Sequence, residues 1–200
     1  MKIILASNNK NKLLELRRLT EGMGIELVSQ GEAGYDLDVE ETGSTFEENA
    51  YLKARAVTEL SGLPAVADDS GIEVAALGGG PGIYSARFGP GHAATDSERN
   101  EYLLKLMEGV EDRSARFVCC ICGTFPNGDA LRCRGECLGE IEYAQTGSNG
   151  FGYDAVFKPL GYDRGMGELS PQEKNAISHR GKAVREYITK LREYMNETDK

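Results

Sequence analysis

The sequence predicts an α/β fold, and two features of its pattern indicate this class. In the first half, short apolar runs at residues 2–6, 25–28 and 65–67 alternate with amphipathic helical patterns, as in a sheet whose strands are joined by helices. In the middle, the runs at 116–125 and 130–137 flank an Asn-Gly turn, which predicts a β-hairpin. No repeat, low-complexity tract or linker-like stretch divides the 200 residues, so we expect one domain over residues 1–200.

Three of the expected helices begin at capping signals, in which a Ser or Thr is followed three residues later by Glu. The first, at residues 45–48, predicts a helix to residue 60, and the second, at 95–98, predicts a helix with Leu106 among its inward-facing residues. The third, at 170–173, also has proline at the first helical position. That helix is short, because residues 178–181 interrupt it before a final amphipathic helix.

Composition and charge limit the classes of function. The net charge of −9 argues against nonspecific binding to nucleic acid, which depends on clustered Lys and Arg, although a local basic pocket can still bind a small anion. No apolar run approaches the ~18 residues of a membrane-spanning helix. The polar residues 7–10 follow the first strand too soon for the apolar core of a signal peptide. We therefore expect a cytoplasmic protein without a membrane partner.

The five cysteines lie close together in the chain, at Cys119, Cys120, Cys122, Cys133 and Cys137. Their odd number, without an export signal, indicates reduced thiols. Four of them could be written as zinc ligands, which would make the hairpin part of a regulatory or binding module. However, neighbouring side chains in a strand point to opposite faces, so buried thiols are the favoured interpretation.

The stretch around Asp68 and Asp69 organises the functional interpretation. An apolar run ends there in Asp68-Asp69-Ser70-Gly71, which we interpret as the end of a strand and a turn before a return strand at 72–74. Adjacent carboxylates repel each other unless a cation, a donor or a proton lies between them, and a divalent metal is one such partner. A turn whose side chains cap the backbone is the alternative.

Basic residues occur at two places where an anion would be stabilised. Lys10 and Lys12 lie in the first turn of a predicted helix, where the macrodipole disfavours cations unless an anion is also present. Lys53 borders the apolar stripe of the helix that starts at residue 45, four residues after Asn49. Solvated lysines near a helix start, and a lysine that merely covers apolar surface, are the alternatives.

Two later segments have the residue types of a binding site. The glycine-rich stretch 147–154 contains two aromatic residues, which can lie against a flat ligand or anchor the loop to the core. Lys174, His179 and Arg180 place three donors around the predicted helix break, although a basic surface would also explain them. The glycines at 78–82 fit neither a P-loop nor a dinucleotide-binding motif, and residues 89–92 are predicted to be a loop.

Six motifs occur in an order that resembles a known family. They are Ser7-x-Asn9-x-x-Lys12, Glu41-Thr-Gly-x-Thr-Phe-x-Glu-Asn-Ala50, Ala67-Asp-Asp-Ser-Gly71, Pro81-Gly-Ile-Tyr-Ser-Ala-Arg87, Phe151-Gly-Tyr-Asp154 and Ile177-Ser-His-Arg-Gly181. Together they cover nearly the whole chain, and on them the sequence closely resembles the inosine triphosphate pyrophosphatases, also called dITP/XTP pyrophosphatases.

The resemblance implies an enzyme that hydrolyses nonstandard purine nucleoside triphosphates (XTP, ITP and dITP) to the monophosphate and pyrophosphate with Mg²⁺. It also implies an elongated ITPase-like or Maf-like α/β fold, in which helices flank a long twisted mixed sheet and two lobes surround a central cleft. Members of the family usually form homodimers. A pyrophosphatase for other modified nucleotides, including pyrimidines, is the nearest alternative.

The resemblance also assigns roles to individual residues. Asp69 is implied as general base and metal ligand, with Glu41 as the second metal ligand. Phosphate-binding residues are Ser7, Asn8, Asn9, Lys10, Asn11 and Lys12, assisted by Lys53, and Ser70 contacts the substrate. Phe151, Gly152, Tyr153, Asp154, Lys174, His179 and Arg180 are implied to surround the nucleoside.

The sequence departs from the family pattern at two positions beside the implied base pocket. Asn149 replaces a usual glycine, and Ala155 stands where proline often follows the motif. The preference among inosine, deoxyinosine and xanthosine triphosphates is therefore open. The role of Asp68, as a metal-supporting or more remote group, is also open.

Overall fold

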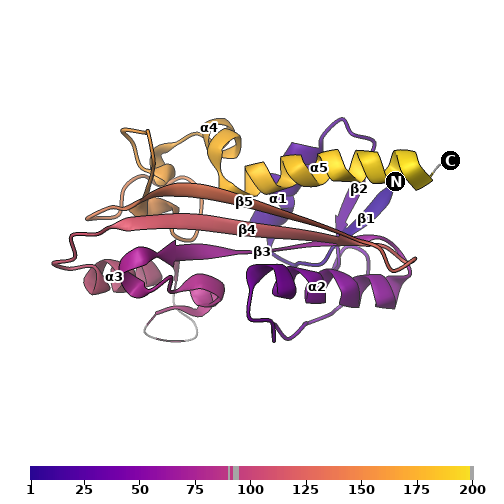
Figure 1. Cartoon of the computed structure of the whole chain (residues 1–200), viewed down its shortest axis with the longest axis horizontal. Coiled ribbons are helices and arrows are strands. Elements are labelled where there is room, and N and C mark those ends of the chain that lie inside the picture. Colours follow the sequence, from indigo (N-terminus) through magenta and orange to yellow (C-terminus); the bar gives the residue numbers. More distant parts are fainter. Residues whose placement is uncertain (90, 92–94, 199–200) are drawn as a thin grey trace. The chain divides into compact units, whose positions relative to one another are not determined.

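The computed structural model describes residues 1–89, 91 and 95–198, and its helices and strands follow the predicted α/β pattern (Figure 1). Residues 90 and 92 of the predicted loop at 89–92 lie outside this part of the chain. The strands are β1 (Lys2–Leu5), β2 (Glu26–Ser29), β3 (Ala65–Val74), β4 (Ser114–Thr124), β5 (Ala130–Ile141) and β6 (Phe157–Pro159). The α-helices are α1 (Lys10–Thr20), α2 (Phe46–Ser61), α3 (Asp96–Leu106), α4 (Pro171–Ile177) and α5 (His179–Thr198), with short 3₁₀ turns between some elements.

The strands form one mixed sheet in the order β2-β1-β3-β4-β5-β6. β1 pairs in parallel with β2 and β3, whereas β5 pairs with β6 in the antiparallel direction. A helix joins β1 to β2, and a second joins β2 to β3, as parallel pairing requires. The predicted α/β class, a mixed sheet flanked by helices, is therefore confirmed.

Internal contacts divide the chain into two compact units. Unit 1 comprises Met1–Asp69, Cys119–Gly135 and Arg180–Lys200, and unit 2 comprises Ser70–Val118 and Glu136–His179. β3, β4 and β5 each contribute residues to both units. The expectation of one domain over residues 1–200 stays a prediction.

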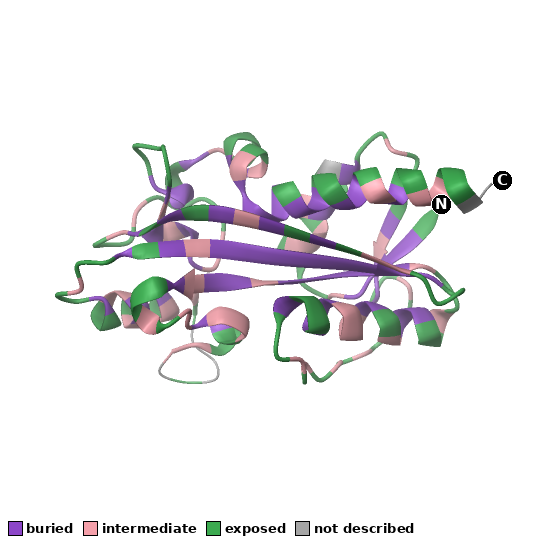
Figure 2. Cartoon of the chain, in the orientation of Figure 1, coloured by how far each residue is buried: buried purple, intermediate pink, exposed green. Residues whose placement is uncertain are grey.

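Unit 1 packs helices against both faces of its strands, with α5 on one side and α2 on the other (Figure 1). Val66 belongs to the cluster that contains Leu16 of α1 and Val184 of α5, whereas Ala67 belongs to the cluster that contains Ala54 of α2. Consecutive β3 residues thus face opposite clusters, as the two-residue period of a strand demands. Figure 2 shows that β4 is buried along most of its length, as expected for a strand covered on both faces.

Unit 2 has its own core, which contains Ile72 of β3, Phe117 of β4 and Phe157 of β6. Leu103 of helix α3 and Met107, the residue after the helix, are fully buried in it. The predicted inward position of Leu106 is wrong, since this residue is 41% exposed. Helices begin at all three predicted capping signals, with Thr45, Thr95 and Ser170 as the N-cap residues of α2, α3 and α4.

Two strand predictions need correction. The predicted turn at residues 68–71 is wrong, because β3 runs without interruption from Ala65 to Val74. The hairpin strand predicted at residues 130–137 is too short, because β5 continues to Ile141. Adjacent Asp, Ser and Gly residues favour a turn locally, but the ladder formed with neighbouring strands outweighs that preference.

A helix that crosses a bilayer needs about 20 mostly apolar residues. None of the helices in the described ranges is both long enough and apolar enough to do so.

Candidate active site

The two adjacent aspartates of β3 point to opposite faces of the sheet in unit 1. Asp68 shares its face with Val66, and Asp69 shares its face with Ala67, because side chains alternate along a strand. Both carboxylates are buried, Asp68 to 2% and Asp69 to 7% exposure. Each therefore needs its own partners, and α1 and α5 supply one set while α2 supplies the other.

Asp69 contacts a lysine and an amide from helix α2. Lys53 Nζ donates to Asp69 Oδ1 at 3.0 Å and to Glu41 Oε1 at 2.7 Å. Asn49 Nδ2 donates to Asp69 Oδ2 at 3.3 Å, and Asn49 Oδ1 accepts from the amide of Gly43 at 2.9 Å. Asn49 and Lys53 are four residues apart, so the helix presents both on one face. One ammonium group thus joins the two carboxylates that the resemblance assigns to a metal.

Burial and neighbouring charges set the proton affinity of Asp69. Burial raises the pKa of this carboxyl above its ordinary value, the negative charge of Glu41 raises it further, and Lys53 opposes the rise without cancelling it. The pKa of Lys53 is itself raised, because Asp69, Glu41 and Asp68 outweigh the effect of its burial. Asp69 is accordingly a stronger proton acceptor than an exposed aspartate, held beside a permanent cation.

Asp68 lies in a different environment, between a lysine and an arginine. Lys12 Nζ is 3.2 Å from Asp68 Oδ2, and Arg180 reaches the same oxygen from Nε and Nη2, each at 3.2 Å. Glu15 pairs with Arg180 Nη1 at 2.5 Å. Burial alone would raise the pKa of Asp68, but Lys12, Arg180 and Lys53 outweigh burial and hold it well below its usual range. Asp68 is therefore a permanent anion rather than a proton acceptor.

The segment before α1 has the hydrogen bonds of a helix start. Asn9 caps the helix, and its Oδ1 accepts from the amides of Asn11 and Lys12 at 3.0 and 3.2 Å. Ser7 Oγ accepts from the amide of Asn9 at 3.1 Å. Asn8, Lys10 and Asn11 are exposed, whereas Lys12 turns inward to Asp68. The predicted phosphate-binding residues thus form one continuous exposed segment, apart from Lys12 and the partly buried Ser7.

Apart from Arg180, which belongs to unit 1, the predicted base-binding residues lie in unit 2, where Asp154 and Lys174 form a buried ion pair. Lys174 Nζ is 2.7 Å from Asp154 Oδ2, and the same oxygen accepts from the amide of Phe151 at 2.8 Å. The ammonium of Lys174 also lies over the Phe151 ring, 4.7 Å from its centroid. Three of the predicted residues are therefore brought together around one carboxylate.

Tyr153 is part of the core of unit 2. Its ring is buried, and its hydroxyl donates to the carbonyl of Ser85 at 2.8 Å. Burial raises the pKa of this phenol well above its ordinary value. Tyr153 therefore anchors the loop to the core, which is the alternative interpretation of this aromatic residue. Phe151 is partly exposed, and its contact with a ligand stays a prediction.

The three donors predicted around the helix break each have their own partners. Lys174 pairs with Asp154, Arg180 pairs with Asp68 and Glu15, and the His179 ring stacks on Phe117 with centroids 4.7 Å apart. Their contact with a nucleoside stays a prediction, as does that of Ser70, which is partly exposed on β3.

Sequence reasoning left two of these partners out of the site. Asn49 was recognised only as a motif residue, although its spacing from Lys53 is the signal that places it beside Asp69. Glu15 lies three residues after Lys12, which is the spacing of neighbours on a helix, but nothing local connects it to Arg180.

Glu41 and Asp69 are the two carboxylates that the resemblance assigns to a metal. Within the part of the chain that the structure describes, no three His, Cys, Asp or Glu side chains come together to hold a metal. The zinc alternative for the cysteines is therefore wrong, and all five are buried thiols that no disulfide joins. Magnesium in nucleotide sites commonly takes only one or two carboxylates, and substrate phosphates complete its coordination. Glu41 and Asp69, which share one cation, fit that smaller requirement.

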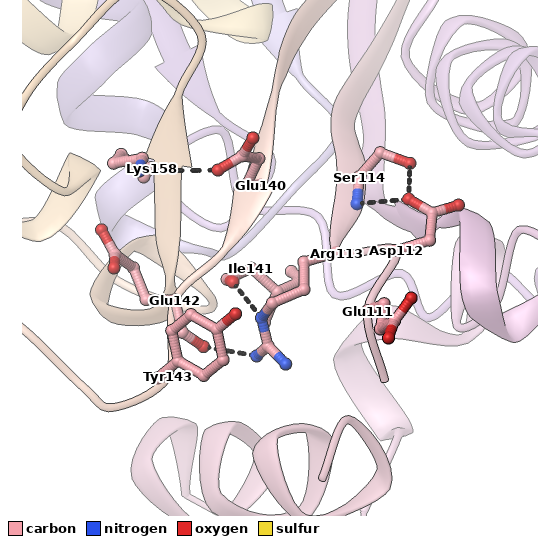
Figure 3. A pocket seen from close by; sticks show the side chains of 9 residues that line it. All are labelled: Glu111, Asp112, Arg113, Ser114, Glu140, Ile141, Glu142, Tyr143 and Lys158. Carbon is pink, nitrogen blue, oxygen red and sulfur yellow. Dashed lines mark hydrogen bonds and ion pairs between the residues drawn. The ribbon is translucent and has the colours of Figure 1, made fainter. Parts of the chain in front are cut away.

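A polar pocket in unit 2 includes none of the predicted site residues. Figure 3 shows its lining, which comes from residues 111–114, 140–143 and Lys158. Arg113 donates there to the backbone carbonyls of Met107, Ile141 and Glu142 at 2.7–2.9 Å. These bonds fasten β4, β5 and the end of α3, so the guanidinium has a structural role.

The fold and these contacts define an α/β protein in which two buried aspartates on one strand of a mixed sheet meet cations from the surrounding helices. A family model described as the Ham1 family matches residues 3–190, and the chain belongs to that family. The chain is 46% identical to the dITP/XTP pyrophosphatase of Coxiella burnetii over 197 residues, which are 96% of this chain and 98% of that protein. It is 47% identical to the dITP/XTP pyrophosphatase of Desulforamulus reducens over 187 residues, 92% of each.

Solved structures agree with the family assignment. A HAM1 protein from Coxiella burnetii superposes with a TM-score of 0.89 at 46% identity, covering 96% of this chain and 99% of that chain. The Ham1 protein of Staphylococcus aureus gives a TM-score of 0.89 at 40% identity, covering 97% and 100%. The predicted family is therefore confirmed.

Proposed function

We propose that this chain hydrolyses nonstandard purine nucleoside triphosphates (XTP, ITP and dITP) between the α and β phosphates, releasing the monophosphate and pyrophosphate. The observation that carries the proposal is the partly buried group of Glu41, Lys53 and Asp69, in which a carboxylate of raised pKa lies beside a cation. The relatives named dITP/XTP pyrophosphatase, at 46–47% identity over nearly the whole chain, support the choice of substrate.

The polyphosphate is assigned to unit 1. A triphosphate carries several negative charges, and attack by water at phosphorus requires that these charges be neutralised. Lys10, Lys12 and Lys53 are the lysines of this unit that the resemblance assigns to the phosphates, and the amides at the start of α1 lie beside Lys10 and Lys12. Lys12 is already held by Asp68, so its ammonium is ordered before a ligand binds.

Asp69 is assigned as the general base. It would accept a proton from the attacking water at a carboxylate oxygen, and in the protein without metal the burial of this side chain raises its pKa, which favours proton uptake. Glu41 and Asp69 would hold Mg²⁺, which supplies charge neutralisation at the phosphates when it is bound. Lys53 keeps the two carboxylates together despite their mutual repulsion, and Asn49 orients Asp69.

Base selection is assigned to unit 2. The Phe151 ring offers a flat apolar surface, and Lys174 offers a donor that can face a purine 6-oxo group. Adenine has an amino group at that position, so two donors would oppose each other and one would be left unpaired. Such a buried unpaired donor costs ~1–3 kcal/mol, which is enough to discriminate against ATP. Homodimerisation is proposed from the family resemblance, and sedimentation equilibrium tests it.

The deciding experiment is a nucleotide panel with identification of products. Purified protein with Mg²⁺ is expected to convert ITP, dITP and XTP to the monophosphate and pyrophosphate, with kcat/KM far above that for ATP, GTP and pyrimidine triphosphates. Release of orthophosphate with a diphosphate left behind would refute the proposed cleavage. Higher kcat/KM for modified pyrimidines would favour the alternative pyrophosphatase.

A further inference from the structure

Helix α3 holds the backbone of Gly152 at both its amide and its carbonyl. Asp96 Oδ2 accepts from the Gly152 amide at 2.6 Å, and Asn100 Nδ2 donates to the Gly152 carbonyl at 3.0 Å. The two α3 residues are four apart, so one face of the helix presents both groups. The capping box of Thr95 and Glu98 fixes where this helix starts and therefore where Asp96 lies.

Asn100 is buried although its side chain is polar. It is only 2% exposed, and its Oδ1 atom has no hydrogen-bond partner among the residues that the structure describes. A buried amide with an unsatisfied oxygen costs stability that an apolar residue at the same place would not. The hydrogen bonds of Asn100 Nδ2 offset part of this cost. Nδ2 donates to the Gly152 carbonyl and, at 3.5 Å, to Gln145 Oε1.

Gly152 is the point at which the orientation of the loop is decided. Its φ of +64° is in the left-handed region, which favours glycine. The Phe151 ring lies on one side of this residue, and on the other side Tyr153 is anchored to the carbonyl of Ser85. Rotation about the backbone dihedrals of Gly152 would therefore move Phe151 relative to the Asp154–Lys174 pair.

We propose that Asp96 and Asn100 are positioning residues for recognition of the purine base. Asp96 fixes the peptide group before Gly152 and Asn100 fixes the one after it, so together they hold the Phe151 ring and the Asp154–Lys174 pair in place before the base arrives. A site that is ordered in advance loses less conformational entropy on binding. This inference rests on the proposed function, because it assigns the residues to the base-binding part of that function.

The test compares three variants on the full-length protein. Asp96→Ala removes the acceptor for the Gly152 amide, Asp96→Asn keeps an acceptor oxygen, and Glu101→Gln changes an exposed charge on the same helix. The side chain of Asp96 is 44% exposed, so the alanine variant should fold.

For Asp96→Ala we expect KM for ITP to rise about fivefold to tenfold with kcat little changed, and the ratio of kcat/KM for ITP over ATP to fall. Asp96→Asn should restore most of the loss, and Glu101→Gln should match wild type.

The outcomes separate this inference from the proposed function. If wild-type protein does not hydrolyse ITP, the proposed function is wrong. If wild type is active and Asp96→Ala keeps both its KM and its discrimination against ATP, the positioning role is overturned. Asn100→Ala provides the second measurement, because it removes the donor to the Gly152 carbonyl. Thermal unfolding is recorded in parallel. A lower Tm with unchanged KM and discrimination in that folded variant would equally count against the role.

Discussion

Arg180 donates from both Nε and Nη2 to one oxygen of Asp68, although the two residues are 112 positions apart in the chain. Lys12 reaches the same oxygen, and Glu15 occupies the remaining arm of the guanidinium. This buried network ties the start of α5 to the centre of β3 within unit 1. It also separates the two aspartates chemically, because Asp68 is held as an anion while the pKa of Asp69 is raised.

Removing one partner of the buried network should be strongly destabilising. In Asp68→Asn, Arg180 and Lys12 lose their shared anion, and such losses cost about 3–5 kcal/mol. Urea unfolding measures the free energy. Arg55→Gln is the control, since its pair with Glu59 is exposed to solvent and contributes little to stability. If both variants lost the same small amount, the network would not have the role described. The double variant Asp68→Asn, Arg180→Met should recover part of the loss.

Asp69→Asn should abolish turnover while nucleotide binding survives. The amide keeps the size of the side chain but cannot accept the proton of water, and loss of a general base typically lowers the rate about 10²–10⁴-fold. ITP hydrolysis gives kcat, and titration calorimetry with inosine monophosphate measures binding. Asp36→Asn, on an exposed loop, is the matched control. Activity retained in Asp69→Asn would refute the role of general base.

Glu41→Gln should increase the Mg²⁺ concentration needed for half-maximal activity by about tenfold or more, since even indirect changes at metal sites weaken affinity about 10–100-fold. The amide still offers an oxygen to Lys53, so the fold should be retained. Glu40→Gln changes the preceding, exposed carboxylate and is expected to leave the Mg²⁺ dependence at its wild-type value. Identical Mg²⁺ titrations for the two variants would remove Glu41 from the metal site.

The cap of helix α4 should contribute to sensitivity to acid. The amide of Ser170, its hydroxyl and then Arg164 lower the pKa of Glu173 from 4.5 to about 2. The unfolded chain therefore takes up this proton first as the pH falls, and the stabilisation, present above pH 4.5, is lost towards about pH 2. Glu173→Gln should lower Tm at pH 6, and its difference from wild type should shrink below pH 4.5. A difference in Tm that is constant from pH 6 to about 2 would contradict this assignment.

The sequence carried enough local information for most helices and strands. Ser170 with Pro171 and Glu173 predicted the start of α4, and the apolar stripe of α5 from Ala183 to Leu191 is buried as expected. Local signals failed at Asp68-Asp69-Ser70-Gly71, where a composition typical of a turn lies inside a continuous strand. There the pairing with neighbouring strands decided the conformation, and pairing depends on residues that are distant in the chain.

The sequence by itself determined the α/β class, the family and the residue types of the candidate site, because capping signals, periodicity and motif order are local properties of the chain. Only the tertiary structure decided which aspartate meets which cation. That choice follows from the alternation of side chains along β3, which turns Asp68 towards Arg180 and Asp69 towards Lys53. Partners separated by many residues are selected by packing, and so the different chemistry of two adjacent, identical side chains arises only on folding.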